Sequence, residues 1–500
     1  MFLLILKHWN AIIMKHQIKQ LLISSVVLSA LNSQQSIAFA QGSLTPSGPP
    51  APIMKTLEQI EPRTPISSAP YSITIPGSYY LTSNLTVNVG EDAIGIFTNG
   101  VTLDLRGFTI SSTASPAGGA GIALHDVAMI HILDGNIAGN VTVISNSYFG
   151  GGFSYGVYVS AGCNAVRVTS ISVSEVGFDA INLTAGNASV VEACTVNVAG
   201  GIGIEADSVA NSVAIACGSS GIIATTANNS YGVTTGSGYG VEAGTVNNCY
   251  GSSLGNDGIH AVGTAENCYG TTSSSGDSGL YAYSAQNCYG NATGAGYGIF
   301  STTATGCYGS SSTGTGLYAQ NNVENCYGYS AAGTGLIANS AIICYGYSGG
   351  SGIGLQANEI AQSCYGSSSA GNGLTAYDAE NCLGSSSASG FGVGTGLTAS
   401  LAENCEGSSV GGVGLQVYNL ALNCTGGCEG SDYGINAPYM ATGCAGTSGT
   451  GIGLKTQIAN GCFGQNNNNS AAGLQATDAN FSFGIGNPTV SISGNQYNMP

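Results

Sequence analysis

Asn267-Cys268-Tyr269-Gly270 is one copy of a motif that recurs along the second half of this 500-residue chain. The cysteine position continues with other following residues at Cys382, Cys405, Cys424, Cys444 and Cys462, and serine fills it at Ser230 and Ser482. A period this regular predicts one structural unit that is repeated, with each copy contacting chiefly its neighbours. Cys-Tyr-Gly itself returns every 18 to 20 residues, at Cys249, Cys268, Cys288, Cys307, Cys326, Cys344 and Cys364.

A second landmark, a glycine followed by an apolar residue, marks the start of each unit. It occurs first at Gly95-Ile96 and last at Gly473-Leu474, and with Ala180-Ile181 it makes nineteen starts. Such units are too short for a strand and a helix, so every coil should consist of strands and turns. The pattern predicts an all-β fold, a right-handed parallel β-helix of about 19 coils with a short N-terminal cap. Strands stacked at about 4.8 Å would form a rod about 90 Å long.

The unit at residues 279–290 shows how a coil is expected to fold. Leu280 and Ala282 alternate with two tyrosines, as in a strand with one buried face. The residue before the cysteine is Asn or Gly in ten of the twelve units from Cys249 to Cys462. Because these residues tolerate a positive φ, the coil is predicted to bend there.

The N-terminus resembles an export signal. Within residues 1–40, a basic stretch at 14–20 precedes an apolar stretch at 21–31, and Ala38-Phe39-Ala40 fits a cleavage site. The apolar stretch is too short to span a bilayer. We therefore expect a secreted or cell-surface protein, with no transmembrane segment in the mature chain.

The rest of the chain divides by composition and spacing. Residues 41–76 hold eight prolines and are predicted to form a linker and the N-terminal cap, in which residues 54–61 could make a short helix. Irregular coils with longer loops should occupy residues 77–220, and regular coils with the Cys/Tyr repeat residues 221–484. Residues 485–500 are predicted to be a C-terminal tail.

Composition limits the possible partners. The chain has 79 glycines, 7% charged residues and a net charge of −17. A surface this acidic repels the phosphates of nucleic acid, which we exclude as a partner. The low charge does not indicate disorder, because periodic Val, Ile, Leu, Tyr and Cys supply apolar faces to bury.

The cysteine position is predicted to face the interior, and the next position the solvent. Only Cys or Ser occupies the first from Ser230 to Ser482, whereas the second accepts Glu406. We favour an interior ladder of free thiols, since free Cys packs as a small hydrophobe. Disulfides between coils, or a local loop from Cys424 to Cys428, are the alternative. We expect no metal site and no cofactor, because no His accompanies the cysteines and no C-x-x-C motif occurs.

Two N-terminal stretches resemble a known group of proteins. They are ITIPGSYYLTSNL at residues 73–85 and VTLDLRGFTI at residues 101–110. Together they are similar to the opening of bacterial secreted right-handed β-helix proteins, whose fold is shared with pectate lyases and polygalacturonases. The resemblance implies the fold and little about a reaction.

A row of tyrosines is the first candidate binding site. At one ring per coil it would form an exposed stripe about 30 Å long. Aromatic rings with hydroxyls suit sugar rings or a protein partner. Stacking of ring on ring, which would stabilise the solenoid without binding anything, is an equally open interpretation. The row consists of Tyr250, Tyr269, Tyr289, Tyr308, Tyr327, Tyr345 and Tyr365.

Catalytic residues, if the chain has them, should lie in the early coils, where the unit starts are farther apart. The clustered acids or bases of the related lyases and hydrolases are not found, so no residue role is transferred from them. The candidates are Asp104, Asp134, Arg167 and Asp179, although Asp104 and Asp134 lie near strand ends and also fit turn residues.

The loop at residues 147–155 adds a second group of candidate binding residues, because its aromatic rings could grip a glycan. They are Tyr148, Phe149, Phe153 and Tyr155.

Three functions stay open on this evidence. The first is non-catalytic binding of a polysaccharide or another cell-surface component through the tyrosine row. The second is a polysaccharide lyase or glycoside hydrolase with its site on the N-terminal coils. The lack of a basic cluster in the sequence disfavours lyase action on an acidic polysaccharide. The third is a structural surface rod or adhesin stalk.

Overall fold

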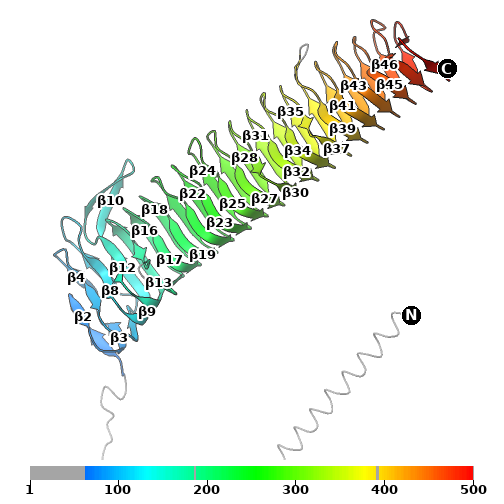
Figure 1. Ribbon diagram of the computed structural model, residues 1–500. Coiled ribbons are helices and arrows are strands. Elements are labelled where there is room, and N and C mark those ends of the chain that lie inside the picture. Colours follow the sequence, from blue (N-terminus) through cyan, green and yellow to red (C-terminus); the bar gives the residue numbers. More distant parts are fainter. Residues whose placement is uncertain (1–61, 185–186, 390–392, 499–500) are drawn as a thin grey trace, which may run out of the picture. The chain divides into compact units, whose positions relative to one another are not determined.

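A computed structural model describes residues 62–184, 187–389 and 393–498. These residues form an all-β parallel solenoid of about 23 turns, and no helix occurs among them (Figure 1). The predicted fold class is confirmed, with more turns than the 19 expected. The export signal and the short helix predicted for residues 54–61 lie outside the described residues.

Part of the difference in turns arises at the two ends, where the glycine landmark is missing. Strand β1 (Thr64–Ile66) pairs with β3 (Gly77–Leu81), and β2 (Tyr71–Ile73) pairs with β5 (Ile94–Ile96). The described part of the linker and cap segment therefore already belongs to the sheet. At the other end, two strands continue the stack beyond residue 485: β50 (Val490–Ile492) pairs with β47 (Leu474–Ala476), and β51 (Gln496–Tyr497) pairs with β48 (Asp478–Asn480).

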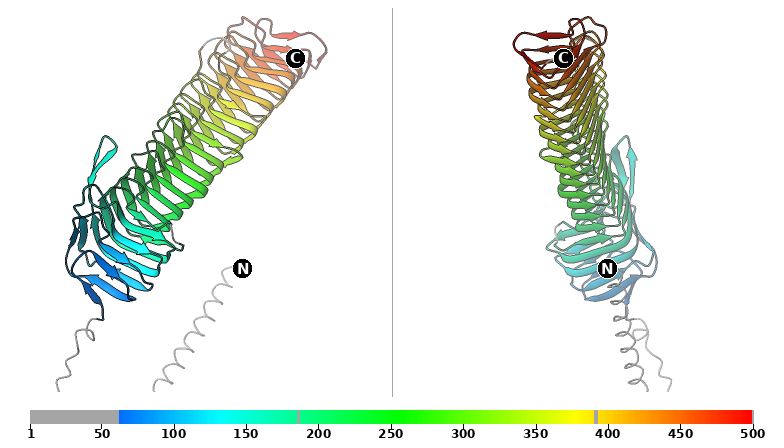
Figure 2. Two further views of the ribbon diagram at one scale, coloured as in Figure 1. Left: turned by 60° about the vertical axis from the view of Figure 1, so that its left-hand side comes forward. Right: turned by 90° about the vertical axis from the view of Figure 1, so that its right-hand side faces the viewer.

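The N-terminal coils vary in strand length. The longest strands, β9 (Ala128–Ala138) and β13 (Asn164–Val176), pair in parallel. Strands β10 (Asn140–Ile144) and β11 (Ser147–Gly151) form an antiparallel hairpin that projects from the side of the rod (Figure 2). The other strands of this part are β4 (Leu85–Val87), β6 (Val101–Asp104), β7 (Thr109–Ser112), β8 (Ala120–His125), β12 (Tyr155–Ala161), β14 (Ile181–Asn182), β15 (Val190–Glu192), β16 (Thr195–Ala199), β17 (Ile204–Ala210) and β18 (Val213–Cys217).

Each later coil has a long strand that starts after the landmark glycine and a short strand that starts after the cysteine position. Three long strands are divided at a corner: β29 (Leu317–Ala319) with β30 (Asn322–Glu324), β36 (Leu374–Thr375) with β37 (Asp378–Glu380), and β47 with β48. The undivided long strands are β19 (Ile222–Asn228), β21 (Val241–Asn247), β23 (Ile259–Glu266), β25 (Leu280–Gln286), β27 (Ile299–Thr305), β32 (Leu336–Ile342), β34 (Leu355–Gln362), β39 (Leu397–Glu403), β41 (Leu415–Leu422), β43 (Ile435–Thr442) and β45 (Leu454–Asn460).

The short strands differ little in length from coil to coil. They are β20 (Tyr231–Thr234), β22 (Tyr250–Ser253), β24 (Tyr269–Thr272), β26 (Tyr289–Ala292), β28 (Tyr308–Ser311), β31 (Tyr327–Ser330), β33 (Tyr345–Ser348), β35 (Tyr365–Ser368), β38 (Leu383–Ser386), β40 (Glu406–Ser409), β42 (Thr425–Cys428), β44 (Ala445–Ser448), β46 (Phe463–Asn466) and β49 (Phe483–Ile485).

The interior of a coil is narrow. Leu280 and Ala282 of β25 point inward, and Leu280 is in register with Ile299 of the next coil. A side chain at Gly290, the glycine of one Cys-Tyr-Gly copy, would overlap the carbonyl oxygen of Gly298. Two backbones thus pass within contact distance of each other there, which only glycine permits.

The predicted bend before the cysteine is confirmed. Asn267 and Gly306 adopt positive φ values of 53° and 63°. Ile343 (54°) and Ser363 (53°), which are the two exceptions to the Asn/Gly pattern, adopt the same conformation. A β-branched residue is rare in this region of φ, so the stacked neighbours impose the bend even where the residue does not favour it.

Candidate functional site

The cysteines of the repeat form a continuous interior row, which we call the thiol ladder. None of them is in a disulfide, as the sequence led us to favour. The Sγ of Cys326 accepts the backbone N–H of Cys307 in the preceding coil at 3.4 Å and donates to the backbone oxygen of Glu324 at 3.2 Å. The thiol therefore occupies a place in the hydrogen-bond pattern of the sheet at the bend. The ladder comprises Cys249, Cys268, Cys288, Cys307, Cys326, Cys344, Cys364, Cys382, Cys405, Cys424, Cys444 and Cys462, all buried.

Serine can replace cysteine because its hydroxyl makes the same two bonds. The N–H of Cys462 donates to Ser482 Oγ at 3.1 Å, and that hydroxyl donates to the oxygen of Asn480 at 3.0 Å. The arrangement also extends to Ser212, which accepts the N–H of Cys194 at 3.2 Å, a continuation that the sequence spacing did not reveal. The restriction to Cys or Ser thus reflects hydrogen bonding as well as size.

Burial makes the thiols of Cys249 and Cys217 poor candidates for chemistry. Burial raises the pKa of Cys249 to about 11 and that of Cys217 to about 12. The thiolate is the nucleophile and the metal ligand, and these groups hold their protons at neutral pH. Within residues 62–498, apart from the two gaps, no group of three or more His, Cys, Asp or Glu side chains could hold a metal ion.

Cys428 belongs to a second interior row. It is in register with Ser409 and Ser448 of the neighbouring coils and is buried. It forms no disulfide with Cys424. The local loop considered as an alternative is therefore not formed, because the intervening strand β42 is extended.

The predicted tyrosine row exists and is one ring longer than expected. Tyr231 begins it; the sequence pattern missed this ring because a serine precedes it. Neighbouring centroids are 4.5 to 5.2 Å apart and the rings are stacked. Because ring faces cover each other, the exposed part, 39% at Tyr269, is an edge. We call Tyr231, Tyr250, Tyr269, Tyr289, Tyr308, Tyr327, Tyr345 and Tyr365 the tyrosine ladder.

A groove of about 500 Å³ runs beside part of this ladder. One side is formed by Tyr308, Tyr327, Tyr345 and Tyr365. The other side is the column of bend residues, and no charged side chain lines the groove. It can therefore offer ring edges, an amide and hydroxyls to an elongated uncharged ligand, but not the open ring faces on which a sugar stacks. The bend residues are Gly306, Asn325, Ile343 and Ser363.

A second stack of rings lies on the long strands and was not anticipated. His260, Tyr281, Phe300 and Tyr318 follow one another with centroid separations of 4.6, 5.3 and 5.1 Å. His260 Nδ1 also lies 2.8 Å from Asp257 Oδ2. The sequence signal for this stack is the aromatic character of the position two residues after successive landmark glycines.

Two of the four catalytic candidates are engaged in ion pairs. Asp104 lies 3.1 Å from Arg63 and accepts the backbone N–H of Arg106 at 2.8 Å. Arg167 lies 3.2 Å from Glu192. Two guanidinium groups, those of Arg63 and Arg106, lie over the ring of Tyr80 at 4.9 and 5.0 Å, a basic pair that the sequence spacing did not suggest.

The other two candidates lie in different places. Asp134, with a φ of 56°, lines a shallow groove of about 420 Å³ with Asn136 and Ser170. Asp179 lies in the turn before β14, which pairs with β12, whereas Asp104 ends β6, which pairs with β9. The structure therefore does not bring the four candidates together in one site.

Asp179 instead approaches Glu205, a residue that sequence reasoning missed. The side-chain nitrogen of Asn182 donates to Asp179 at 2.8 Å and to Glu205 at 3.2 Å. Burial, followed by the charges of Asp179 and Glu242, raises the pKa of Glu205 to about 7. A carboxyl that keeps its proton near neutral pH thus lies beside a second carboxylate.

Aromatic rings flank this acidic pair. Tyr155 stacks on Tyr158 at 4.3 Å and on the exposed Phe178 at 5.9 Å. Asp179 also accepts the N–H of Ile202 at 2.8 Å, which joins two coils. The pair therefore has a structural role at Asp179, whereas Glu205 accepts a hydrogen bond from Asn182 and has a pKa near neutral.

In the loop predicted to grip a glycan, two of the four aromatic side chains are held by contacts within the rod. Tyr148 on the hairpin donates to the backbone oxygen of Ala216 at 2.9 Å and lies 3.0 Å from the hydroxyl of Thr235. Phe153 is fully buried, so it cannot contact a ligand from solution. Phe149 is 56% exposed and is the one ring of the four with an open side chain on the hairpin.

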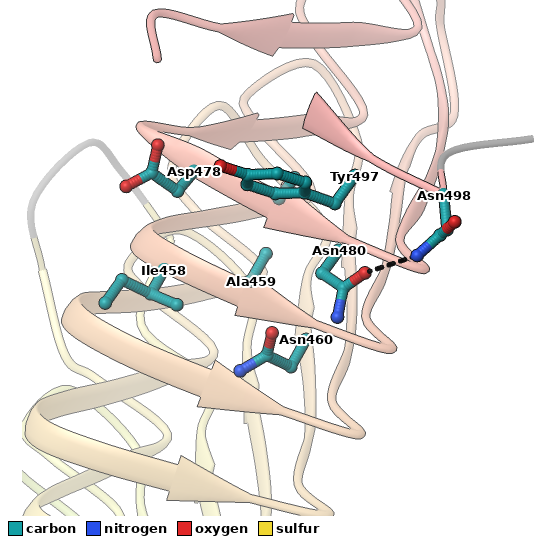
Figure 3. Close-up of a pocket in the computed structure, with 8 residues that line it drawn as sticks. Ile458, Ala459, Asn460, Asp478, Asn480, Tyr497 and Asn498 are labelled. Atoms are coloured by element: carbon teal, nitrogen blue, oxygen red, sulfur yellow. Dashed lines mark hydrogen bonds between the residues drawn. The ribbon is translucent and has the colours of Figure 1, made fainter. Parts of the chain in front are cut away.

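Figure 3 shows a further groove, of about 380 Å³, at the C-terminal end. Ile458 and Asn460 of β45 line it together with Asp478 and Tyr497. Asn498 donates to Asn480 at 3.4 Å across its edge. The groove forms where the final strand covers only part of the preceding coil.

Comparison with known proteins finds no matching family model, no matching curated protein and no matching solved structure. In the part of the chain that the structure describes, no helix has the length and apolar character needed to cross a bilayer.

Proposed function

We propose that the chain is an extracytoplasmic, non-catalytic rod that binds a polysaccharide or another cell-surface component. The observation that carries the proposal is the uncharged groove beside the tyrosine ladder, where ring edges, Asn325 and Ser363 line about 500 Å³. Binding sites combine apolar surface with a few placed polar groups, and this groove has both. The ladder itself stabilises the rod by stacking, and the groove beside it supplies the contact.

The expected export of the chain and the resemblance of its N-terminal stretches support the same proposal. The signal-like residues 1–40 favour export, and the similarity of residues 73–85 and 101–110 to secreted right-handed β-helix proteins favours the pectate-lyase-like superfamily. The full chain has a net charge of −17, and loss of residues 1–40 removes three lysines and no acid, so an exported rod is more acidic still and disfavours acidic ligands. A neutral glycan is therefore the favoured ligand class.

Affinity electrophoresis of the mature protein in gels that contain neutral or acidic polysaccharides tests the proposal. Tyr327→Phe with Tyr345→Phe keeps the stack and removes two hydroxyls from the groove. We expect weaker retardation by the glycan that binds. Tyr250→Phe, in the same ladder but outside the groove, is the matched control. Absence of any binding across the panel would contradict the proposed function.

Glycoside hydrolysis is the second candidate, favoured by the protonated Glu205 beside Asp179. Paired carboxyls of unequal pKa are the usual acid and base of this reaction. Activity should then fall as pH rises through about 7, where Glu205 loses its proton. Release of reducing ends that disappears in Glu205→Gln, with folding intact, would replace the binding proposal by an enzymatic one.

A further inference from the structure

We infer that a second groove, around Tyr377 and Tyr418, is a binding site for a neutral glycan chain that lies along the rod. The inference rests on the proposed function and adds a site on the long strands, whereas the groove beside the tyrosine ladder lies at the bend and the short strands. Eleven residues from four consecutive coils line this groove of about 460 Å³. Four coils at about 4.8 Å give it a length of about 14 Å along the rod.

The two tyrosines present open ring faces. Tyr377 is 59% exposed and Tyr418 53% exposed. Ser400 occupies the coil between them and also lines the groove, so the two rings do not stack on each other. The rings are two coils apart, about 10 Å along the axis. Unlike the tyrosine ladder, this pair can receive the apolar face of a sugar ring on each phenol.

Amide and hydroxyl groups surround the rings. Gln356 donates to Asn358 at 3.0 Å, and Asn419 donates to Ser400 at 2.7 Å. An amide has two donor hydrogens and two acceptor lone pairs, so each group keeps capacity for a ligand hydroxyl. The existing bonds hold the amides in place, which lowers the cost of ordering them on binding.

The charges indicate a neutral ligand. None of the eleven lining residues is charged, and Glu359 and Asp378 directly follow Asn358 and Tyr377 in the sequence. These carboxylates would repel an acidic polysaccharide. The alanines of the floor, Ala357, Ala376 and Ala399, are buried, so the floor lies close to the backbone and admits a chain between the two rings.

Affinity electrophoresis tests the site with the mature full-length protein. The gels contain hydroxyethyl cellulose, galactomannan or mixed-linkage β-glucan as neutral probes, and polygalacturonate or alginate as acidic probes. The variant is Tyr377→Ala with Tyr418→Ala. Tyr283→Ala is the matched control. Tyr283 is the third residue after the inward leucine of its coil, the same position that Tyr377 and Tyr418 occupy in theirs. Its side chain is also 62% exposed.

We expect at least one neutral glycan to bind the unchanged protein, with affinity reduced roughly tenfold or more in the double variant, as for the loss of an aromatic anchor. The control should bind normally, and circular dichroism should show all three proteins folded. Equal binding by the double variant would overturn the site and leave the proposed function standing. Binding of acidic glycans alone would also overturn the site, and no binding by the unchanged protein would overturn both proposals.

Discussion

At the scale of single residues, the thiol ladder shows why a cysteine repeat need not mean disulfides. Each ladder thiol donates to an oxygen of its own coil, and several, such as Cys326, also accept a peptide N–H from the preceding coil. Sequence comparison identified the buried orientation, because the position admits only Cys or Ser. The hydrogen bonds depend on the bend and on the coil spacing, so the sequence did not reveal them.

The first prediction concerns this bond. Cys326→Ser should change stability little, whereas Cys326→Ala should leave the N–H of Cys307 unpaired in the interior, at a cost of about 1–3 kcal/mol. Thermal unfolding followed by circular dichroism gives the melting temperatures of the unchanged protein and the two variants, which rank their stabilities. If Cys326→Ala and Cys326→Ser unfold at the same temperature, the thiol acts only as filler.

The second prediction concerns Glu205. Its folded pKa of about 7 lies above the ordinary value of 4.5, so the folded state binds a proton more strongly than the unfolded state. Its contribution to stability is present below pH 4.5 and is lost as pH rises to about 7. Glu205→Gln should therefore raise the melting temperature more at pH 8 than at pH 4. The control is Glu324→Gln, which alters an exposed carboxylate on a regular coil. If Glu205→Gln changed the melting temperature equally at both pH values, the raised pKa of Glu205 would be contradicted.

At the scale of a strand or a row, spacing decides whether a side chain is structural or available. Strands about 4.8 Å apart bring equivalent rings into stacking distance, so an uninterrupted row such as the tyrosine ladder covers its own faces. An interrupted row leaves faces open, as at Tyr377 and Tyr418. Once the register between coils is known, the sequence shows whether a row of aromatic residues is interrupted.

The third prediction belongs to this scale and concerns the glycine of the repeat. Gly290→Ala would place a methyl group against the carbonyl oxygen of Gly298. We expect a loss of about 2 kcal/mol or more in unfolding free energy, since backbone must move to relieve the overlap. Gly276→Ala, at a turn with open space, should change stability little. Equal melting temperatures for the two variants would show that the coil interior is wider than described.

At the scale of the whole molecule, contacts run almost entirely between neighbouring coils, as in other solenoids. Stability should then be a sum over coils and their interfaces. The rod carries one candidate groove beside the short strands of residues 306–365 and another on the long strands of residues 356–419, and the coil of β34 and β35 contributes to both. Together they could hold a long ligand at more than one point, which increases overall affinity.

The fourth prediction follows from this independence. Deletion of residues 308–326 removes one complete 19-residue unit and joins Cys307 to Tyr327, which restores Cys-Tyr-Gly. The shortened chain should fold and unfold close to the parent temperature, because it loses one coil and one interface. Deletion of residues 308–317 shifts the register and should unfold most of the rod. Similar stability of the two deletions would contradict a regular solenoid.

The repeat pattern is enough to predict the all-β parallel solenoid, the inward cysteine, the outward tyrosine and the bend between them. These follow from a repeat in which each position has one environment in every coil, so comparing copies shows which side chains are buried. Which side chains touch across coils became visible only in the folded rod. It showed the tyrosine faces to be covered, Phe153 to be buried and Tyr148 to be docked on Ala216. It also placed Asp179 beside Glu205 and set Tyr377 and Tyr418 along one groove, because loops of unequal length set the register between coils, and local sequence does not specify that register.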